Sequence, residues 1–207
     1  TWNPTHPHQR FVDVSDGTKG LSIINDGLRE YEVTDDETRT IGITLLRAFE
    51  ISLATVAWKW ERHPEMNGSQ CLGEHEFNYQ IYPHQGDWDK GNVMSVADSF
   101  NVPIDIAQAG PYKGDLPKSQ SFMELKGEGL MLSSIKKAED SDDAILRIYN
   151  PTKRKINGGL SLFIKPANVE IVNLNEEKIE KQECKLNENE VQISAEPKKI
   201  ITLKVKF

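Results

Sequence analysis

The sequence lacks the short motifs that mark several large classes of enzyme. It contains no Gly-x-Ser-x-Gly nucleophile elbow, no Walker-type phosphate loop and no Gly-x-Gly-x-x-Gly dinucleotide fingerprint. No apolar run approaches the ~20 residues that a membrane-spanning helix needs, so we expect no membrane partner. The net charge of -7 argues against nucleic-acid binding, because phosphate contacts require clustered Lys and Arg.

Cysteine is also scarce. Cys71 and Cys184 lie far apart and form neither a Cys-x-x-Cys pair nor a zinc spacing. The sequence therefore predicts two reduced thiols and a cytoplasmic protein, since secreted proteins tend to pair their cysteines. The chain starts at Thr1 without Met or a signal-peptide pattern, and we interpret it as a fragment of a longer protein.

What the sequence has is a series of short apolar runs separated by turn residues, which predicts an all-β protein. The segment 109–117 is rich in Gly and Pro, and the composition changes there. Residues 1–118 carry 10 Lys and Arg against 18 Asp and Glu, whereas residues 119–207 carry 15 against 14. We therefore predict two domains, 1–117 and 118–207. The spacing of the runs in the second domain is typical of a small antiparallel β-sandwich. Its expected strands are 122–126, 130–137, 144–149, 158–164, 169–173, 190–194 and 200–207.

Residues 73–88 form the most ordered pattern in the first domain. Phe77, Tyr79 and Ile81 alternate with polar residues, which predicts a strand with these three side chains on a dry face. Pro83 is expected to end this strand, because proline has no amide hydrogen for a ladder.

The sequence also predicts secondary structure for three other segments of the first domain. The run 40–49 is the most β-rich and is expected to be central in its sheet. The segment 51–70 allows a short helix or an irregular loop. The segment 92–101 has helix-compatible spacing, with a strand or an irregular edge as the alternative.

No catalytic apparatus is visible in the residues. The histidines have neither zincin spacing nor a cysteine partner, so we predict no metal site within this chain and expect ordinary hydrogen-bonded imidazoles. Glu74 with Glu76, and the acidic run 35–37, are carboxylate groupings of the kind that sugar hydrolysis uses, but solvated or structural roles explain them as well. The five histidines are His6, His8, His63, His75 and His84.

Several blocks together resemble the C-terminal part of glycoside hydrolase family 38 α-mannosidases. Their order and spacing match over nearly the whole chain. The blocks are His6-Pro7-His8-Gln9-Arg10-Phe11-Val12-Asp13-Val14-Ser15-Asp16-Gly17, Asn25-Asp26-Gly27, Thr44-Leu45-Leu46-Arg47-Ala48, Gly73 to Tyr79, Pro83 to Trp88, and Leu146 to Thr152.

This resemblance implies a fold and a role that composition does not indicate. It implies that the first domain is part of a large mutarotase-like β-supersandwich. It also implies a retaining mannosidase whose upstream barrel supplies the nucleophilic Asp, the acid and the Zn²⁺ ligands. No catalytic residue and no cofactor are then expected here. By the resemblance, an Arg after an acidic tip contacts the sugar site, and Arg39 is the nearest match. Asn25 and Asp26 are a second pair of candidate substrate-binding residues.

The function expected from this resemblance is non-catalytic. The chain would pack on the catalytic barrel of the same polypeptide, line the mannoside pocket and be compatible with a homo-oligomer. Two alternatives remain at this stage. One is a carbohydrate-binding module that uses the Trp side chains of residues 2, 58, 60 and 88 for stacking on sugars. The other is a purely structural or oligomerisation domain.

Overall fold

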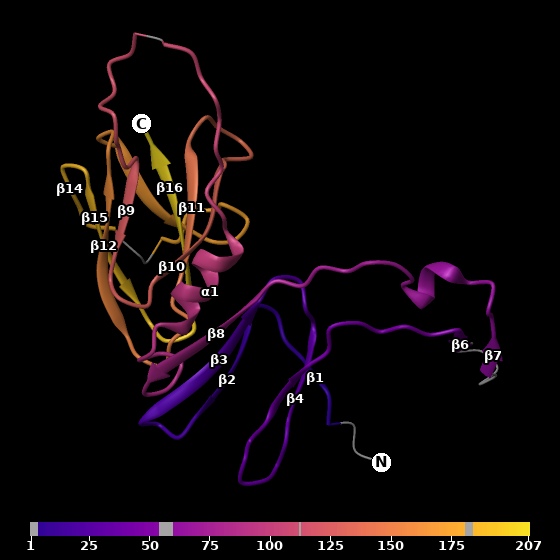
Figure 1. Cartoon of the computed structure of the whole chain (residues 1–207). Coiled ribbons are helices and arrows are strands. Elements are labelled where there is room, and N and C mark those ends of the chain that lie inside the picture. The colour runs from indigo at the N-terminus through magenta and orange to yellow at the C-terminus, as the bar shows by residue number, and fades with distance from the viewer. Residues whose placement is uncertain (1–3, 54–59, 112, 181–183) are drawn as a thin grey trace. The chain divides into compact units, whose positions relative to one another are not determined.

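The computed structural model of the chain describes residues 4–53, 60–111, 113–180 and 184–207 (Figure 1). The chain divides into two compact units, Thr1–Ile104 and Asp105–Phe207, which are described separately below. Antiparallel strands dominate both units, so the predicted all-β class is confirmed. Among the described residues, no helix is long and apolar enough to cross a membrane.

The described residues of the first unit, unit 1, form three antiparallel sheets. In the sheet β2-β3-β8, the central strand β3 pairs with β2 on one side and with β8 on the other. The sheet β1-β4-β5 follows along the chain, and β6 pairs with β7. The strands are β1 His6–Pro7, β2 Phe11–Ser15, β3 Lys19–Asn25, β4 Glu30–Val33, β5 Ile41–Ile43, β6 Ile51–Leu53, β7 Trp60–Arg62 and β8 Tyr79–Gln85, with a 3₁₀ helix at Asn67–Gln70.

Helix α1, Val93–Asn101, packs against strand β3 and covers one face of the sheet β2-β3-β8. Its residues Val93 and Ala97 are fully buried, as is Ile24 of β3. The spacing of four residues places Val93 and Ala97 on the same side of the helix. Of the two alternatives that the sequence left open for this segment, the helix is the one observed.

The second unit, unit 2, is a β-sandwich. One sheet has the order β10-β11-β16-β13 and the other has the order β14-β15-β12-β9, with all pairs antiparallel. Both sheets contribute to a single apolar core, which is the small sandwich predicted from the sequence. The strands are β9 Met123–Lys126, β10 Met131–Lys137, β11 Ala144–Tyr149, β12 Ile156–Leu162, β13 Asn168–Val172, β14 Leu186–Asn187, β15 Glu190–Ala195 and β16 Ile200–Lys206.

Two buried polar residues tie the turn after β11 to the rest of the sandwich. Asn150 Nδ2 donates to the carbonyl oxygens of Arg154 (2.7 Å) and Ala195 (3.1 Å). Asn150 Oδ1 accepts from the amide and the hydroxyl of Thr152, at 2.9 and 2.7 Å. Each of these buried polar groups therefore has a partner, which offsets its loss of water.

The structure corrects three sequence predictions in unit 1. Segment 51–70, expected to be a short helix or an irregular loop, contains the paired strands β6 and β7 and a 3₁₀ helix. Segment 40–49 is not a central strand: only Ile41–Ile43 pair, and β5 is at the edge of its sheet. Pairing with β4 ends where the Thr44 amide donates to the Glu30 carbonyl, and Leu45 and Leu46 beyond it are exposed.

The third correction concerns β8. Pro83 does not end this strand. Because β8 is an edge strand, a residue whose backbone nitrogen faces away from β3 needs no amide hydrogen for the ladder. Tyr79 and Ile81 are not on a dry face either: their side chains are 54% and 60% exposed.

Candidate functional site

The tip of the β4–β5 hairpin is organised by one carboxylate. Asp36 Oδ1 accepts hydrogen bonds from the hydroxyls of Thr34 (3.0 Å) and Thr38 (2.6 Å). It also accepts from the amides of Thr38 (2.9 Å) and Arg39 (3.1 Å). The Thr38 hydroxyl first, and then the Thr34 hydroxyl, lower the pKa of the Asp36 carboxyl below its ordinary value. The charged carboxylate thus holds the tip in one conformation at neutral pH.

Arg39 is presented at this tip in a defined way. Its backbone is left-handed, with φ of 48°, a conformation that costs a side chain with a Cβ some strain and that the Asp36 bonds sustain. The guanidinium Nη1 pairs with Asp35 Oδ1. The Arg39 side chain is 54% exposed and that of Asp35 is 95% exposed. A guanidinium in this setting is oriented by a carboxylate and still has donors available for hydroxyl or carboxylate groups of a ligand.

Asn25 is buried, whereas a residue that contacts a ligand must be accessible to it. Its side chain is fully buried at the end of β3. Oδ1 accepts from the Leu28 amide at 3.0 Å, and Nδ2 donates to His8 Nε2 at 2.7 Å. Burial lowers the pKa of His8, against the hydrogen bond from Asn25, so the imidazole is neutral and accepts at Nε2. Asn25 therefore positions the turn between β3 and β4.

Asp26 and the loop beyond it are more accessible. The Asp26 side chain is exposed, and its amide donates to the Asn78 carbonyl at 3.3 Å. The adjoining residues 27–30 and 44–47 line a shallow cavity of about 280 Å³. Arg47 and Glu30 face each other there, with Arg47 Nη1 2.9 Å from Glu30 Oε1. Asn25 and Asp26 precede β4 and Arg39 follows it, so the structure places the predicted residues toward opposite ends of one strand.

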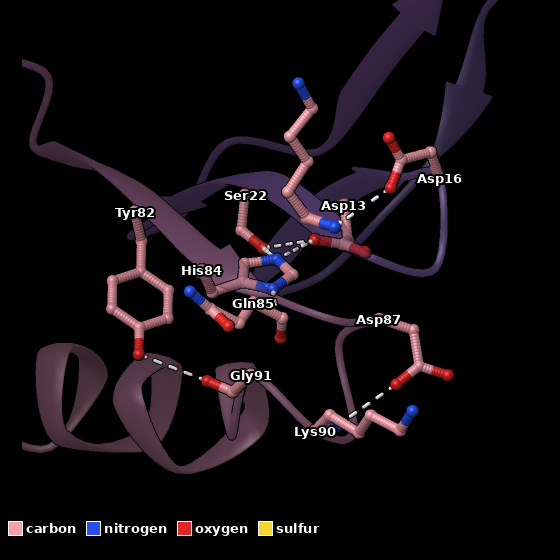
Figure 2. A network of polar contacts seen from close by, with 10 residues as sticks. Asp13, Asp16, Ser22, Tyr82, His84, Gln85, Asp87, Lys90 and Gly91 are labelled. Atoms are coloured by element: carbon pink, nitrogen blue, oxygen red, sulfur yellow. Dashed lines mark hydrogen bonds and ion pairs between the residues drawn. The ribbon is translucent and has the colours of Figure 1, made fainter.

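A buried polar network that the sequence analysis did not assemble lies under helix α1 (Figure 2). Asp13 Oδ1 accepts from the Ser22 hydroxyl and from His84 Nε2, each at 2.6 Å. The His84 side chain is 2% exposed and that of Asp13 is 8% exposed. A carboxylate oxygen only accepts, so in this contact the hydrogen lies on His84 Nε2. These three residues, Asp13, Ser22 and His84, are called the polar node below.

Backbone and glycine geometry hold the imidazole of the polar node in place. A Cβ added to Gly20 would lie 2.3 Å from His84 Cε1, and one added to Gly91 would lie 2.4 Å from His84 Nδ1. The ring therefore fits between two positions without side chains. The ring of Tyr82 stacks on the His84 imidazole, with 5.8 Å between the ring centroids. The Tyr82 hydroxyl donates to the Gly91 carbonyl at 3.1 Å (Figure 2).

The polar node has the residue types of a hydrolytic triad but not the arrangement. In a triad, the carboxylate and the nucleophile hydrogen-bond to different nitrogens of the histidine. Here the hydroxyl of Ser22 and the imidazole of His84 both donate to the same oxygen of Asp13, and Ser22 is fully buried. The geometry fits a structural anchor. Its only signal in the sequence is a polar residue between two apolar ones in β2 and again in β3.

The described residues do not fit the zinc that the family resemblance implies for the intact enzyme. No group of three His, Cys, Asp or Glu among residues 4–53, 60–111, 113–180 and 184–207 is placed to hold a metal ion. Instead, His75 Nε2 lies 2.7 Å from the Cys71 carbonyl, His63 Nδ1 lies 3.0 Å from Glu65 Oε1, and His8 and His84 have the partners given above. Of the tryptophans considered for sugar stacking, Trp2 and Trp58 lie outside the described residues.

The fold and these features define a class before any comparison: a two-unit antiparallel β protein with an arginine-bearing hairpin tip and structurally engaged histidines. Comparison with known proteins specifies the family. Residues 129–203 match the model of the glycosyl hydrolases family 38 C-terminal beta sandwich domain. A putative mannosylglycerate hydrolase from Halalkalibacterium halodurans is 33% identical over 98% of this chain and 21% of its own length. Alpha-mannosidase 2C1 from Homo sapiens is 23% identical over 94% of this chain and 17% of its own length.

The solved structures agree with the sequence relatives. The crystal structure of an alpha-mannosidase from Enterococcus faecalis V583 matches with a TM-score of 0.79 and 26% identity, over 98% of this chain and 21% of that chain. The chain therefore spans about a fifth of the length of this mannosidase and of the H. halodurans relative. The chain belongs to glycoside hydrolase family 38 and corresponds to a C-terminal β region of its members.

Proposed function

We propose that this chain is the non-catalytic C-terminal β region of a retaining, zinc-dependent α-mannosidase that hydrolyses terminal α-mannosides. The observation that carries the proposal is the likeness to a solved alpha-mannosidase over 98% of this chain. In the proposed enzyme, the catalytic barrel elsewhere in the longer polypeptide holds the zinc and the catalytic carboxylates. The engagement of the described histidines in hydrogen bonds within this chain supports that division of roles.

The contribution of this chain to the site is the β4–β5 tip. Arg39 reaches the sugar-binding pocket and orients a mannose hydroxyl or a neighbouring carboxylate through its guanidinium. Asp36 keeps the tip rigid, so that little conformational entropy is lost when the ligand binds. Asp26 is a secondary ligand contact, and Asn25 acts indirectly by fixing the turn that carries Asp26.

The first test compares Arg39→Ala with Arg62→Ala in the longer polypeptide that contains this chain. Arg62 is a matched control, because it is an exposed arginine paired with one carboxylate, Glu50, at 2.8 Å. A hydrogen bond to a charged group contributes about 1.5–3 kcal/mol, so kcat/KM for an aryl α-mannoside should fall roughly 10–100-fold in Arg39→Ala. Arg62→Ala should stay within about twofold. Equal activity of the two variants would favour a purely structural role for the tip.

The second test uses the 207-residue chain by itself. It should not hydrolyse an aryl α-mannoside with or without added Zn²⁺, whereas the longer polypeptide should do so and lose activity on chelation. Zinc-dependent turnover by the 207-residue chain would contradict the proposed division of roles. The proposal also places the enzyme in the cytoplasm, which the free thiols of Cys71 and Cys184 support.

A further inference from the structure

The sheet β14-β15-β12-β9 of unit 2 carries rows of polar side chains on the side away from the sandwich core. Directly paired residues of an antiparallel ladder point to the same side of a sheet, and every second residue of a strand returns to that side. Leu160, Val191 and Ile193 of β12 and β15 belong to the apolar core, so the residues that alternate with them face outward. We call this side the outer face. Its pairs on β12 and β15 are Asn157 with Ser194, Gly159 with Gln192, and Ser161 with Glu190.

Strand β9 extends the outer face on the other side of β12. Lys126 pairs with Gly159, and Glu124 pairs with Ser161. Lys126 Nζ lies 3.2 Å from Glu190 Oε1. A Cβ added to Gly159 would lie 2.9 Å from the same Glu190 oxygen. The ion pair therefore passes over the glycine, which has no side chain in its way.

Two exposed aromatic rings stand at one end of the outer face. The Phe163 amide donates to the Phe122 carbonyl at 3.0 Å, which continues the β9–β12 register one pair beyond Met123 and Leu162. The two rings meet edge to face, with 5.9 Å between their centroids. Phe122 is 60% exposed and Phe163 is 46% exposed. A ring pair that remains this exposed gains little from burial and is better explained as a contact surface.

A cavity of about 900 Å³ adjoins the outer face. Asn157, Gln192 and Ser194 line it together with Asn187 of β14. Ile201 of the other sheet lines it as well, so residues of both sheets surround the cavity. Its volume falls in the range of about 300–1,000 Å³ that is usual for small-molecule sites.

These groups match the chemistry of a sugar chain. A sugar ring offers an apolar C–H face for stacking on an aromatic side chain, and hydroxyls that both donate and accept hydrogen bonds. Amide and hydroxyl side chains such as those of Gln192 and Ser161 also do both. The Ser194 hydroxyl donates to Asn157 Oδ1 at 2.8 Å, which leaves the Asn157 Nδ2 group as a donor for a ligand.

The charges of the outer face disfavour other partners. Glu124 and Glu190 are balanced by Lys126 and by Lys185, which lines the cavity, so a polyanion gains no net attraction. The centres of protein–protein interfaces are depleted in Lys, Glu and Ser, and these are the residue types in the middle of this face. A neutral ligand with many hydroxyls therefore suits the face better than a nucleic acid or another protein surface.

We propose that the outer face binds a neutral oligosaccharide. The pair Phe122 and Phe163 stacks one sugar ring, and the polar rows toward Asn157 bind the hydroxyls of the next ones. From Phe163 to Asn157 the strand spans about 20 Å at ~3.4 Å per residue, which is long enough for more than one sugar unit. This inference is independent of the proposed function, because it concerns binding through unit 2 and requires no hydrolysis.

The first test is a titration of the 207-residue chain with mannose, mannopentaose and cellopentaose, followed through amide resonances. Phe163→Ala and Gln192→Ala each remove one contact. Phe207→Ala is the matched control, because Phe207 is also an exposed phenylalanine of unit 2 and lies outside the outer face. The amide spectrum checks the fold of each variant, and either contact variant suffices if the other does not fold.

The expected result is a saturable shift of the Gly159 and Gln192 amide resonances with at least one pentasaccharide, which binds more tightly than mannose. Phe163→Ala and Gln192→Ala should each raise its Kd about 3–10-fold. Phe207→Ala should change the Kd less than about twofold. No saturable shift, shifts confined to unit 1, or an unchanged Kd in the contact variants would overturn the inference. Shifts of the outer face that depend on protein concentration without sugar would identify a second copy as the occupant and would also overturn it.

The second test uses the longer polypeptide, in electrophoresis through a gel that contains mannan or soluble cellulose derivative, whichever sugar bound in the titration. The polysaccharide should retard the parent and Phe207→Ala, and it should retard the double variant of Phe163→Ala with Gln192→Ala much less. Equal migration of the parent and the double variant would mean that the face is covered or unused there and would overturn the inference. A polypeptide that is retarded in this way but hydrolyses no α-mannoside would contradict the proposed function and leave the sugar-binding face standing.

Discussion

The close fit of His84 between two glycines makes Gly20→Ala a sharp perturbation of unit 1. The added Cβ would lie 2.3 Å from His84 Cε1 and 2.9 Å from Ser15 Cβ, so the imidazole must move. A displaced ring loses its 2.6 Å hydrogen bond to the Asp13 carboxylate. The perturbation thus acts on one defined interaction of a buried group.

The magnitude follows from three contributions. Loss of a hydrogen bond to a charged group costs about 1.5–3 kcal/mol, and forcing an extra carbon into a packed site costs about 1–3 kcal/mol. Replacing glycine by alanine within a strand stabilises the folded state by roughly 0.5–1 kcal/mol, because it reduces the backbone entropy of the unfolded chain. We expect Gly20→Ala to lower the free energy of unfolding of unit 1 by about 2–4 kcal/mol.

Gly42→Ala is the matched control. Gly42 also lies in a strand of unit 1, and a Cβ there would meet only the Glu32 carbonyl at an ordinary 3.9 Å. It should therefore be neutral or stabilising by up to about 1 kcal/mol.

The assay is urea denaturation followed by tryptophan fluorescence. All tryptophans of the chain, residues 2, 58, 60 and 88, fall within unit 1, so this signal reports unit 1 and not unit 2. A double-mutant cycle with His84→Ala locates the cause. In the His84→Ala background, Gly20→Ala should cost less than about 1 kcal/mol, since the obstructing ring is gone. A cost as large as in the wild-type background would refute the reasoning, as would equal stability of Gly20→Ala and Gly42→Ala.

Two other predictions address the hairpin tip and the sandwich. Because hydrogen bonds lower the pKa of Asp36, its contribution to tip order should be complete above about pH 4–5 and lost as the pH falls below the ordinary value of ~3.9. The Thr38 amide resonance, followed from pH 6 to 2, should report this loss, and an unchanged titration in Asp36→Asn would contradict it. Asn150→Ala removes the hydrogen bonds from Nδ2 to the Arg154 and Ala195 carbonyls and the acceptor of the buried Thr152 amide, and it should destabilise unit 2 by about 2–4 kcal/mol. Circular dichroism should show this change while the tryptophan transition stays in place; an unaltered circular dichroism transition would argue against it.

Turn chemistry explains where sequence reasoning succeeded. Strand β11 has the predicted bounds, 144–149, because Asp143 precedes it, Asn150 and Pro151 follow it, and local turn preferences are strong. The remaining sandwich strands deviate by one to a few residues at their ends. β14, which is only Leu186–Asn187, was not predicted, since two residues carry no periodicity.

The errors have a common physical origin in context beyond the local pattern. The run 40–49 has high β-propensity, but pairing depends on a neighbouring strand, and β4 offers one for only three of its residues. Periodicity correctly separated the two faces of β8. It could not indicate which face helix α1 covers, because the helix lies outside the local pattern of the strand.

The candidate site was predictable only in part. The acidic tip before Arg39 was visible in the sequence, whereas the hydrogen bonds that make Asp36 its organiser depend on the hairpin geometry. Asn25 was proposed as a ligand contact, and the structure shows it buried with His8 and Leu28 as partners. The roles of Arg39, Asn25 and Asp26 in substrate binding stay predictions. The domain boundary at 117 also stays a prediction. The two compact units of the structure divide between Ile104 and Asp105.

The polar node has a consequence for how the sheet β2-β3-β8 assembles. A slip of β8 by one residue against β3 would turn Ile81 and Pro83 toward helix α1 and His84 away from it. That slipped pairing would bury Ile81, which is 60% exposed in the observed register, whereas Leu21 and Ile23 of β3 would stay where they are. Only the observed register brings His84 to the carboxylate of Asp13. The buried pair therefore selects one alignment against a hydrophobic competitor, and a chain without Asp13 and His84 should fold to a mixture of strand registers.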